Sequence, residues 1–481
     1  MAFTTVLWLA ALAVTPAKAE HHHVYTVRVD ASLSQLHVAA HFDEPVSEIA
    51  ARSNTARQFL LAAHDCDSRV EVEARGRRLL VPKPGIKCLV YEVDLKQAAR
   101  AEQRNISLHP DNIIVSPTVW MWRPRLAGDD EIEVRFELPD GVQVSVPWRP
   151  DETADDYYHL VASPQSGLAM SAFGRFDKQL MQVADSTLRV DILQTEHATD
   201  TRAIIDWVQD TAHNIARAYG RFPNPDARIV VLPIGSGRGD APVQFGRVVR
   251  DGGETIELMI DPARPMQAFY QNWTATHELS HLMLPYLQSE QRWVSEGFAQ
   301  YYQNILLARA GRYTQRYAWQ KLFDGFERGR ESVPEMSPND AASADERSSR
   351  MKVYWSGAAL ALLADVELRK RSDGKQTLDT VLGEFQDCCL PSQRTWTGLE
   401  LFTKFDSFLD RPLFMDLYRQ HADTAGFPAV RPLLQKLGVI RDGDDRAEVG
   451  LSEAAELAQV RIAMTGRDAS IPEYDSPPRD R

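Results

Sequence analysis

The sequence predicts an α+β protein with several domains, in which an all-β sandwich precedes a domain built from a mixed sheet and a helical lobe. Three observations lead to this prediction. The chain has 481 residues, enough for two or three domains with their own cores. Short alternating or β-branched runs, separated by turn residues, fill residues 23–182. Long segments with a helical apolar period fill residues 267–438.

The composition is that of an ordinary globular protein, with 44% hydrophobic and 25% charged residues. The formal net charge of -13 argues against a nucleic-acid surface, because phosphate binding needs clustered Lys and Arg. The chain after its first twenty residues has no apolar run of 18 residues, which argues against a membrane span. The sequence does not predict an oligomeric state.

Residues 1–19 have the pattern of a signal peptide. The short apolar run Val6–Val14 is followed by Ala-Lys-Ala, a small-residue cleavage pattern, before Glu20. A short buried N-terminal helix is the alternative, because no Lys or Arg precedes the apolar run. We expect export, with a periplasmic or secreted mature protein. Export would permit disulfides among the four cysteines.

The spacing of the cysteines does not fix their pairing. Cys66 and Cys88 flank apparent strands in one region and could pair, whereas Cys388 and Cys389 are adjacent, and a neighbouring pair would be strained. Four cysteines can form two disulfides in three different ways, and the sequence does not select among them. Because no pair has zinc-finger spacing, we favour structural or free thiols.

Residues 20–185 are predicted to form the N-terminal β-sandwich domain. His21, His22 and His23 are expected to form a disordered, non-catalytic end. The runs that read as strands are VYTVRVDAS, QLHVAAHF, RRLLVP, CLVYEVDL, EIEVRFELPDG and VQVSVPW.

Residues 186–262 are predicted to form the sheet lobe of a second domain, which spans residues 186–440. A helix, TRAIIDWVQDTAHNIARAYG, lies among the strand-like runs LRVDIL, ARIVVLPIG, PVQFGRVV and ETIELMID. Residues 263–440 form the predicted helical lobe. A cleft between a sheet and a helical lobe is a common place for an enzyme site. Residues 441–481 are expected to be a flexible tail that contains one helix, AAELAQVRIAM.

The stretch TATHELSHLMLPYL places two histidines four residues apart. On a helix His277 and His281 share one face and can hold a single ion, while Glu278 can reach water bound to that ion. The alternative is a helix that carries these residues by chance. The surrounding sequence AFYQNWTATHELSHLMLPYL fits one amphipathic helix that ends before Pro285.

A third ligand is needed, because catalytic zinc takes three protein ligands and leaves one position open. Glu296 lies fifteen residues after His281, which is enough for a turn and a returning helix. The alternative is a solvated glutamate stabilised by the positive end of that helix.

Two segments of the chain resemble known metallopeptidases. HELSH followed by WVSEGFAQYY resembles the gluzincins, and more closely the glycyl aminopeptidase family. VYWSGAALALLADVELRKRSDGKQTLD resembles the part of that family in which a tyrosine, followed three residues later by Gly, lines the cleft. Tyr354 and Gly357 match it. With FDKQLMQVADSTLRV, PLLQKLGV and the N-terminal β domain, the resemblance covers most of residues 24–438.

The resemblance implies a thermolysin-like zinc peptidase domain over residues 186–440. The C-terminal PDZ-like domain common in the family is not expected, because only about forty residues follow Gly438. One Zn²⁺ per chain would be held by His277, His281 and Glu296, with Glu278 as the general base. Tyr354 would donate a hydrogen bond to the oxyanion, the alternative being a packing tyrosine.

The substrate-binding residues follow from a weaker match. Related aminopeptidases use a Gly-x-Met-Glu-Asn-like or Gly-Gly-x-Glu-like stretch to bind the α-amine of the substrate. Here Gly252, Gly253 and Glu254 stand near that position, one residue short. Glu254 could anchor an amine, or the stretch could be a polar hairpin turn, and nearby Arg247 and Arg250 would favour acidic groups.

The expected function is hydrolysis of peptide or protein substrates, with an aminopeptidase favoured over an endopeptidase. A peptide-binding or scaffolding protein with this fold is the alternative from another class. GSGRG lacks the Gly-Lys-Ser/Thr of a phosphate-binding loop, and the chain has no G-x-S-x-G elbow.

Overall fold

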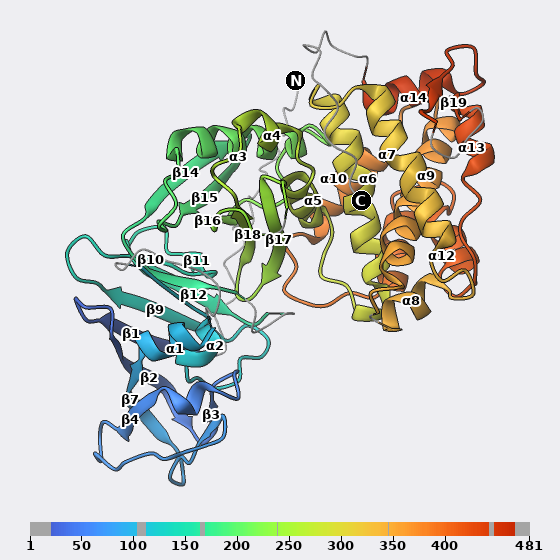
Figure 1. Ribbon diagram of the computed structural model, residues 1–481. Coiled ribbons are helices and arrows are strands. Elements are labelled where there is room, and N and C mark those ends of the chain that lie inside the picture. Colours follow the sequence, from blue (N-terminus) through green and yellow to red (C-terminus); the bar gives the residue numbers. More distant parts are fainter. Residues whose placement is uncertain are drawn as a thin grey trace, which may run out of the picture.

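The computed structural model describes residues 21–102, 112–163, 169–237, 239–344, 346–441 and 447–466. N-terminal sheets are followed by a lobe with a five-stranded sheet and then by a helical lobe (Figure 1). The predicted fold class is therefore confirmed. The predicted signal peptide, residues 1–19, lies outside the described residues. No helix in the described part of the chain is long and apolar enough to cross a membrane.

The N-terminal domain is built on a seven-stranded sheet with the order β11-β12-β9-β1-β2-β7-β4. Alternate side chains of β1 and β2, such as Tyr25, Val27, Leu36 and Val38, are buried in its core. The strands of this sheet are β1 (His22–Val29), β2 (Gln35–Val46), β4 (Leu60–Asp65), β7 (Ile86–Asp94), β9 (Glu131–Glu137), β11 (Arg149–Pro150) and β12 (Tyr157–Val161).

Two three-stranded sheets and three short helices complete the described part of this domain. One sheet contains β8 (Asn112–Val115), β10 (Gln143–Ser145) and β13 (Ser171–Gly174). The other contains β3 (Ile49–Ala50), β5 (Ala74–Arg75) and β6 (Arg78–Leu79). The helices are η1 (Ala56–Gln58), α1 (Leu95–Glu102) and α2 (Pro117–Trp120).

The histidines at the start of this domain are not a disordered end. His22 and His23 begin β1, which pairs with both β2 and β9. His23 is 5% exposed and contacts Phe42 edge to face. The prediction was wrong because the backbone hydrogen bonds of two neighbouring strands order this segment, and those partners lie far away in sequence.

Both cysteine pairs form disulfides, Cys66–Cys88 and Cys388–Cys389. The expectation against a bond between the adjacent cysteines was therefore wrong. Among the described residues no cysteine is free. Residues 388 and 389 end a helix, so the bond links two side chains where the backbone leaves the helical path.

The sheet of the second domain has the order β14-β15-β16-β18-β17. β14 pairs along its length with β15, so the predicted boundary at residue 185 falls inside a hairpin, and the sheet begins at Asp177. The pairing is antiparallel at both edges and parallel between β15, β16 and β18. The strands are β14 (Asp177–Val183), β15 (Ser186–Ile192), β16 (Arg228–Pro233), β17 (Val243–Arg250) and β18 (Glu254–Ile260).

Apolar side chains cover both faces of this sheet. On one face Ile229, Val231, Ile256 and Leu258 belong to the main core, which the helices share. On the other face Val230 and Leu232 form a smaller cluster with residues of the N-terminal domain such as Ile114 and Ala172. The N-terminal domain therefore packs against one face of the sheet of the second domain. The helix that follows β15 is α3 (Thr201–Ala216).

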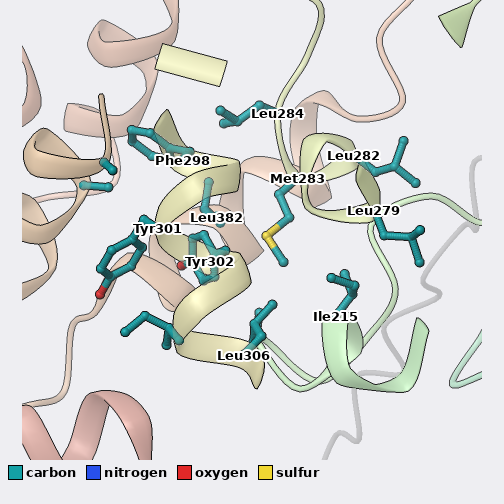
Figure 2. Close-up of a cluster of buried hydrophobic side chains, with 14 of the residues drawn as sticks. Ile215, Leu279, Leu282, Met283, Leu284, Phe298, Tyr301, Tyr302, Leu306 and Leu382 are labelled. Carbon is teal, nitrogen blue, oxygen red and sulfur yellow. The ribbon is translucent and has the colours of Figure 1, made fainter. Parts of the chain in front are cut away.

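The helical lobe packs around α6 (Arg292–Arg309) and α9 (Arg350–Arg371). Figure 2 shows Met283 pointing toward Tyr302 and Leu306 of α6, and Leu279 and Leu282 belong to the same buried cluster. The other helices are α4 (Met266–Gln271), α5 (Thr274–Ser280), η2 (His281–Met283), η3 (Ser289–Gln291), α7 (Gln315–Glu331), α8 (Pro338–Ala344), α10 (Leu378–Cys389), α11 (Gly398–Asp406), α12 (Phe414–His421) and α13 (Arg431–Lys436).

The segment predicted as one amphipathic helix is divided. α4 ends at Gln271, α5 begins at Thr274, and the chain tightens into the 3₁₀ turn η2 at His281. Asn272 is extended, and its side-chain oxygen accepts from the backbone N–H of Thr274. This local hydrogen bond competes with helix continuation and starts a new helix.

Part of the predicted flexible tail is ordered. β19 (Val439–Ile440) pairs with β20 (Gly450–Leu451), and α14 (Ala458–Thr465) follows. Arg461 is 2% exposed, and its Nε donates to the carbonyl of Leu437. The helix predicted over residues 454–464 is present as α14, whereas the flexible-tail prediction was wrong for the rest of residues 447–466, because packing against the helical lobe orders them. Residues 442–446 and 467–481 lie outside the described residues.

Candidate active site

His277, His281 and Glu296 come together with the geometry of a metal site. His277 lies on α5, His281 begins η2, and Glu296 lies in the first turns of α6. Oε2 of Glu296 is 3.3 Å from Nε2 of His277 and 3.6 Å from Nε2 of His281. A tetrahedral zinc site with bonds of about 2.1 Å has donor–donor distances of about 3.4 Å. The three donors therefore fit zinc.

The hydrogen bonds of the two imidazoles favour metal binding through their Nε2 atoms. Nδ1 of His277 lies 2.8 Å from Oε1 of Gln303, and Nδ1 of His281 lies 3.0 Å from Oγ of Ser295. With the proton on Nδ1, each Nε2 can offer its lone pair to an ion that Glu296 also binds. Within the described ranges this is the one group of His, Cys, Asp or Glu whose donor atoms converge in this way.

Sequence reasoning missed Gln303 and Ser295. Ser295 directly precedes Glu296, and Gln303 follows it by seven residues, two turns along the same helix. Helical spacing from Glu296 could therefore have suggested Gln303. Helix α6 provides the third ligand and the hydrogen-bond partners of the other two.

The variant Gln303→Leu is expected to weaken zinc affinity by about tenfold to a hundredfold, because it removes the acceptor that fixes the His277 tautomer. Competition with a chromophoric chelator measures this affinity directly. Gln300→Leu, on the same helix, is the matched control and should bind zinc like the wild-type protein. Equal affinity of both variants would contradict the assigned role of Gln303.

Glu278 points from α5 toward strand β17. Burial raises the pKa of this carboxyl to about 7, with His277 opposing the shift and Glu296 adding to it. A carboxyl with a pKa near neutrality is suited to accept and then release a proton at physiological pH. By contrast, burial lowers the pKa of His281 to about 3, whereas the pKa of His277 is raised, because its hydrogen bond to Glu296 and the nearby carboxylates outweigh its burial.

Gly246 of β17 lies against Glu278, and sequence reasoning missed this residue too. A Cβ atom at position 246 would lie 2.7 Å from Cγ of Glu278 and 3.0 Å from Cγ2 of Thr274. β17 pairs only with β18 among the described strands, so it is an edge strand that passes the catalytic glutamate. A lone glycine inside a strand pattern was the available signal.

Tyr354 reaches the same site from α9. Its ring centroid is 6.0 Å from that of His277. Burial, together with the negative charges of Glu296 and Glu278, raises the pKa of the phenol well above its usual value. Tyr354 therefore keeps its proton and can act as a hydrogen-bond donor.

A contact between two glycines sets the spacing of α6 and α9. A Cβ atom on Gly297 would lie 2.2 Å from Cα of Gly357, and one on Gly357 would lie 2.0 Å from the carbonyl oxygen of Trp293. Gly297 follows the ligand Glu296, and Gly357 lies one turn after Tyr354. This close helix crossing explains why a glycine follows the tyrosine by three residues.

The hairpin with Gly252 and Gly253 packs against the N-terminal domain. A Cβ atom on Gly253 would lie 2.0 Å from the carbonyl oxygen of Pro147, and Gly252 has φ +83° beside Trp148. These glycines allow the hairpin to pack closely on the N-terminal domain, and their role in substrate binding stays a prediction.

Glu254 already has two partners. Its Oε1 accepts from Nε of Arg250 at 3.0 Å, and its Oε2 accepts from Nδ2 of Asn224 at 3.0 Å. Nη2 of Arg250 donates to the carbonyls of His281 and Leu284. Glu254 is thus linked to the end of the metal-binding turn but does not itself face the metal-binding residues.

A sheet lobe, a helical lobe, and a His-Glu-x-x-His segment completed by a glutamate on the next helix define a zinc metallopeptidase of the gluzincin type. Residues 285–359, which include Glu296 and Tyr354, match the model of the M61 glycyl aminopeptidase family. The predicted resemblance to this family is confirmed there.

Solved structures share the fold over most of the chain. An aminopeptidase N family protein from Idiomarina loihiensis is 14% identical, with a TM-score of 0.64, and the match covers 90% of this chain and 82% of that one. An M1 zinc metallopeptidase from Deinococcus radiodurans, bound to a Tyr-Ser-Ala substrate, is 13% identical, with a TM-score of 0.50 and coverages of 85% and 94%.

Yeast LTA4 hydrolase is 11% identical, with a TM-score of 0.52 and coverages of 86% and 70%. At these identities the likeness concerns the fold. No curated protein matches the sequence.

Proposed function

We propose that this protein hydrolyses peptide bonds from the free N-terminus of its substrates, with one zinc ion held by His277, His281 and Glu296. The observation that carries the proposal is the convergence of these three donors beside Glu278 and Tyr354. Zinc, when bound, supplies Lewis acidity to a water molecule and to the scissile carbonyl.

The remaining chemistry belongs to side chains of this protein. Glu278 accepts a proton from the attacking water and passes it to the leaving amine, in keeping with its pKa of about 7. Tyr354 donates a hydrogen bond to the oxygen that becomes negative in the transition state. Because Gly246 has no side chain, the Glu278 side chain can lie close to β17.

The aminopeptidase mode is supported by the description of the matched family. One observation favours an endopeptidase as the second candidate: β17, which passes Glu278, carries no acidic side chain, and both oxygens of Glu254 are already bonded. The two modes differ in whether the enzyme needs a free α-amine.

Hydrolysis of paired peptides with free and acetylated N-termini separates these modes. We expect zinc-dependent hydrolysis that falls by about tenfold or more on acetylation, since a charged contact worth about 1.4 kcal/mol is lost. The measurement is kcat/KM with zinc content determined on the same sample. Equal hydrolysis of both peptides would favour the endopeptidase, and zinc binding without hydrolysis would favour a peptide-binding protein.

Export is also proposed. It is supported by the signal-peptide pattern of residues 1–19 and by two disulfides, which form in oxidising compartments. N-terminal sequencing of the mature protein from its native host is expected to begin at Glu20. Retention of Met1 in the mature protein would contradict export by this route.

A further inference from the structure

The candidate metal site is most accessible on the side of helices α6 and α9. The side chain of Glu296 is 26% exposed, whereas those of His277 and His281 are 4% and 10% exposed. Tyr354 on α9 is also partly exposed, while Glu278 on α5 is buried. A substrate therefore approaches the site from the side on which Glu296 and Tyr354 lie.

An arginine lies one helical turn before each of these two residues. Arg292 begins α6, four residues before Glu296, and Arg350 begins α9, four residues before Tyr354. Residues four apart lie on one face of a helix, and long helical side chains lean toward the N-terminus of their helix. The side chains of Glu296 and Tyr354 therefore lean toward the turns that carry the arginines. Both arginines flank the accessible side of the site.

The crossing of α6 and α9 brings the two arginines near each other. A Cβ atom on Gly357 of α9 would lie 2.0 Å from the carbonyl oxygen of Trp293, the second residue of α6. The first turn of α6 therefore touches α9 one turn away from Tyr354. Burial is the main cause of the raised pKa of Tyr354, and the positive charges of Arg350 and Arg292 both oppose this rise. Both cations thus lie close enough to act on the same phenol.

These arginines add positive charge to a site that is otherwise balanced. The two charges of a bound zinc ion equal those of the ionised carboxylates of Glu278 and Glu296, so the arginines leave an excess of positive charge. The chain as a whole has a formal net charge of -13, so this excess is local. Arg350 is exposed, and its side chain is bonded to none of the described residues. A guanidinium binds a carboxylate through two parallel hydrogen bonds.

We propose that Arg292 and Arg350 form a carboxylate-binding subsite beside the cleaved bond. Its ligand is an acidic side chain next to that bond or the C-terminal carboxylate of a short peptide. This inference rests on the proposed function, because it concerns the substrate of the same site. The arginines take no part in bond cleavage. They bind the carboxylate and so place the scissile carbonyl beside Tyr354.

The test uses the full, zinc-loaded protein and peptides that differ only at the residues on either side of the cleaved bond. These peptides carry Glu, Gln or Lys at each of the two positions and end in an amide. We expect kcat/KM to be about fivefold higher for Glu than for Gln at one of the positions, and lowest for Lys. A neutral tripeptide with a free or amidated C-terminus tests the other source of the carboxylate.

The outcomes separate this inference from the proposed function. A preference for Glu assigns the subsite to an acidic side chain, and a preference for the free tripeptide assigns it to the C-terminus. Hydrolysis without either preference would overturn the inference and leave the proposed peptidase intact. Absence of hydrolysis of any peptide would overturn the proposed function and the inference together.

Variants of Arg350 test its role in this preference. Arg350→Gln is expected to lower the preference, measured as a ratio of kcat/KM values, by about half, since Arg292 remains. Arg350→Glu is expected to abolish it, because two opposite charges then flank the site. Arg371→Gln, at the other end of α9, removes the same charge and should keep the wild-type ratio.

The ratio is measured with both peptides on one enzyme sample, so a change in the folded or zinc-loaded fraction does not alter it. A purely structural role of Arg350 would therefore leave the ratio unchanged. An unchanged ratio in both Arg350 variants would overturn the inference.

Discussion

Glu278→Gln is expected to lower kcat by about a thousandfold and to leave the zinc content unchanged. The amide keeps the size of the side chain and its place beside Gly246, but it cannot accept the proton of the attacking water. Because the donors of His277, His281 and Glu296 remain, metal binding should persist. Steady-state hydrolysis together with metal analysis of the same sample measures both effects.

Glu290→Gln is the matched control, because Glu290 is exposed in the short turn before α6. It should retain wild-type kcat. Hydrolysis by Glu278→Gln at more than a tenth of the wild-type rate, with full zinc content, would show that another group accepts the proton. Loss of zinc in Glu278→Gln would instead show that this carboxyl contributes to metal binding.

Gly357→Ala is expected to destabilise the fold by about 3 kcal/mol and to lower kcat in the protein that remains folded. The added methyl would lie 2.0 Å from the carbonyl oxygen of Trp293 and 2.9 Å from Cα of Gly297. α9 must then move away from α6, which carries Tyr354 away from Glu296. Thermal unfolding gives the stability change, and kcat at saturating substrate gives the loss of transition-state stabilisation.

The control for this variant is Gly450→Ala. The nearest atom to a Cβ at position 450 is the carbonyl oxygen of Ile440 at 3.7 Å, an ordinary contact, so stability and kcat should stay near wild type. If Gly357→Ala lowers stability but folded protein keeps its kcat, the crossing of α6 and α9 does not position Tyr354.

Much of the fold follows from local periodicity. The strands β15, β16, β17 and β18 and the helix α3 lie where alternating and helical apolar patterns predicted them. The spacing of His277, His281 and Glu296 also predicted their convergence, since two helices joined by a short turn have few ways to pack. These features depend on interactions between residues close in sequence.

The misplaced features depend on contacts between distant residues. The β14–β15 hairpin, the order of the histidines in β1 and the packing of residues 447–466 all need partners that no local pattern identifies. The bond between Cys388 and Cys389 is different, because it joins neighbours and was set aside on grounds of strain. Its geometry depends on how the chain leaves α10.

The sequence by itself predicted the class of fold, the candidate metal-binding side chains and the proposed general base, because residue type and helical spacing favour this chemistry. Only the tertiary structure decided what surrounds that centre. In the structure Gly246 lies against Glu278, and Gly252 and Gly253 pack against the N-terminal domain. A cavity lies at the end of β17. Each of these features depends on how closely two backbone segments approach one another. That distance is set by packing between segments that are far apart in sequence, so no single segment predicts it.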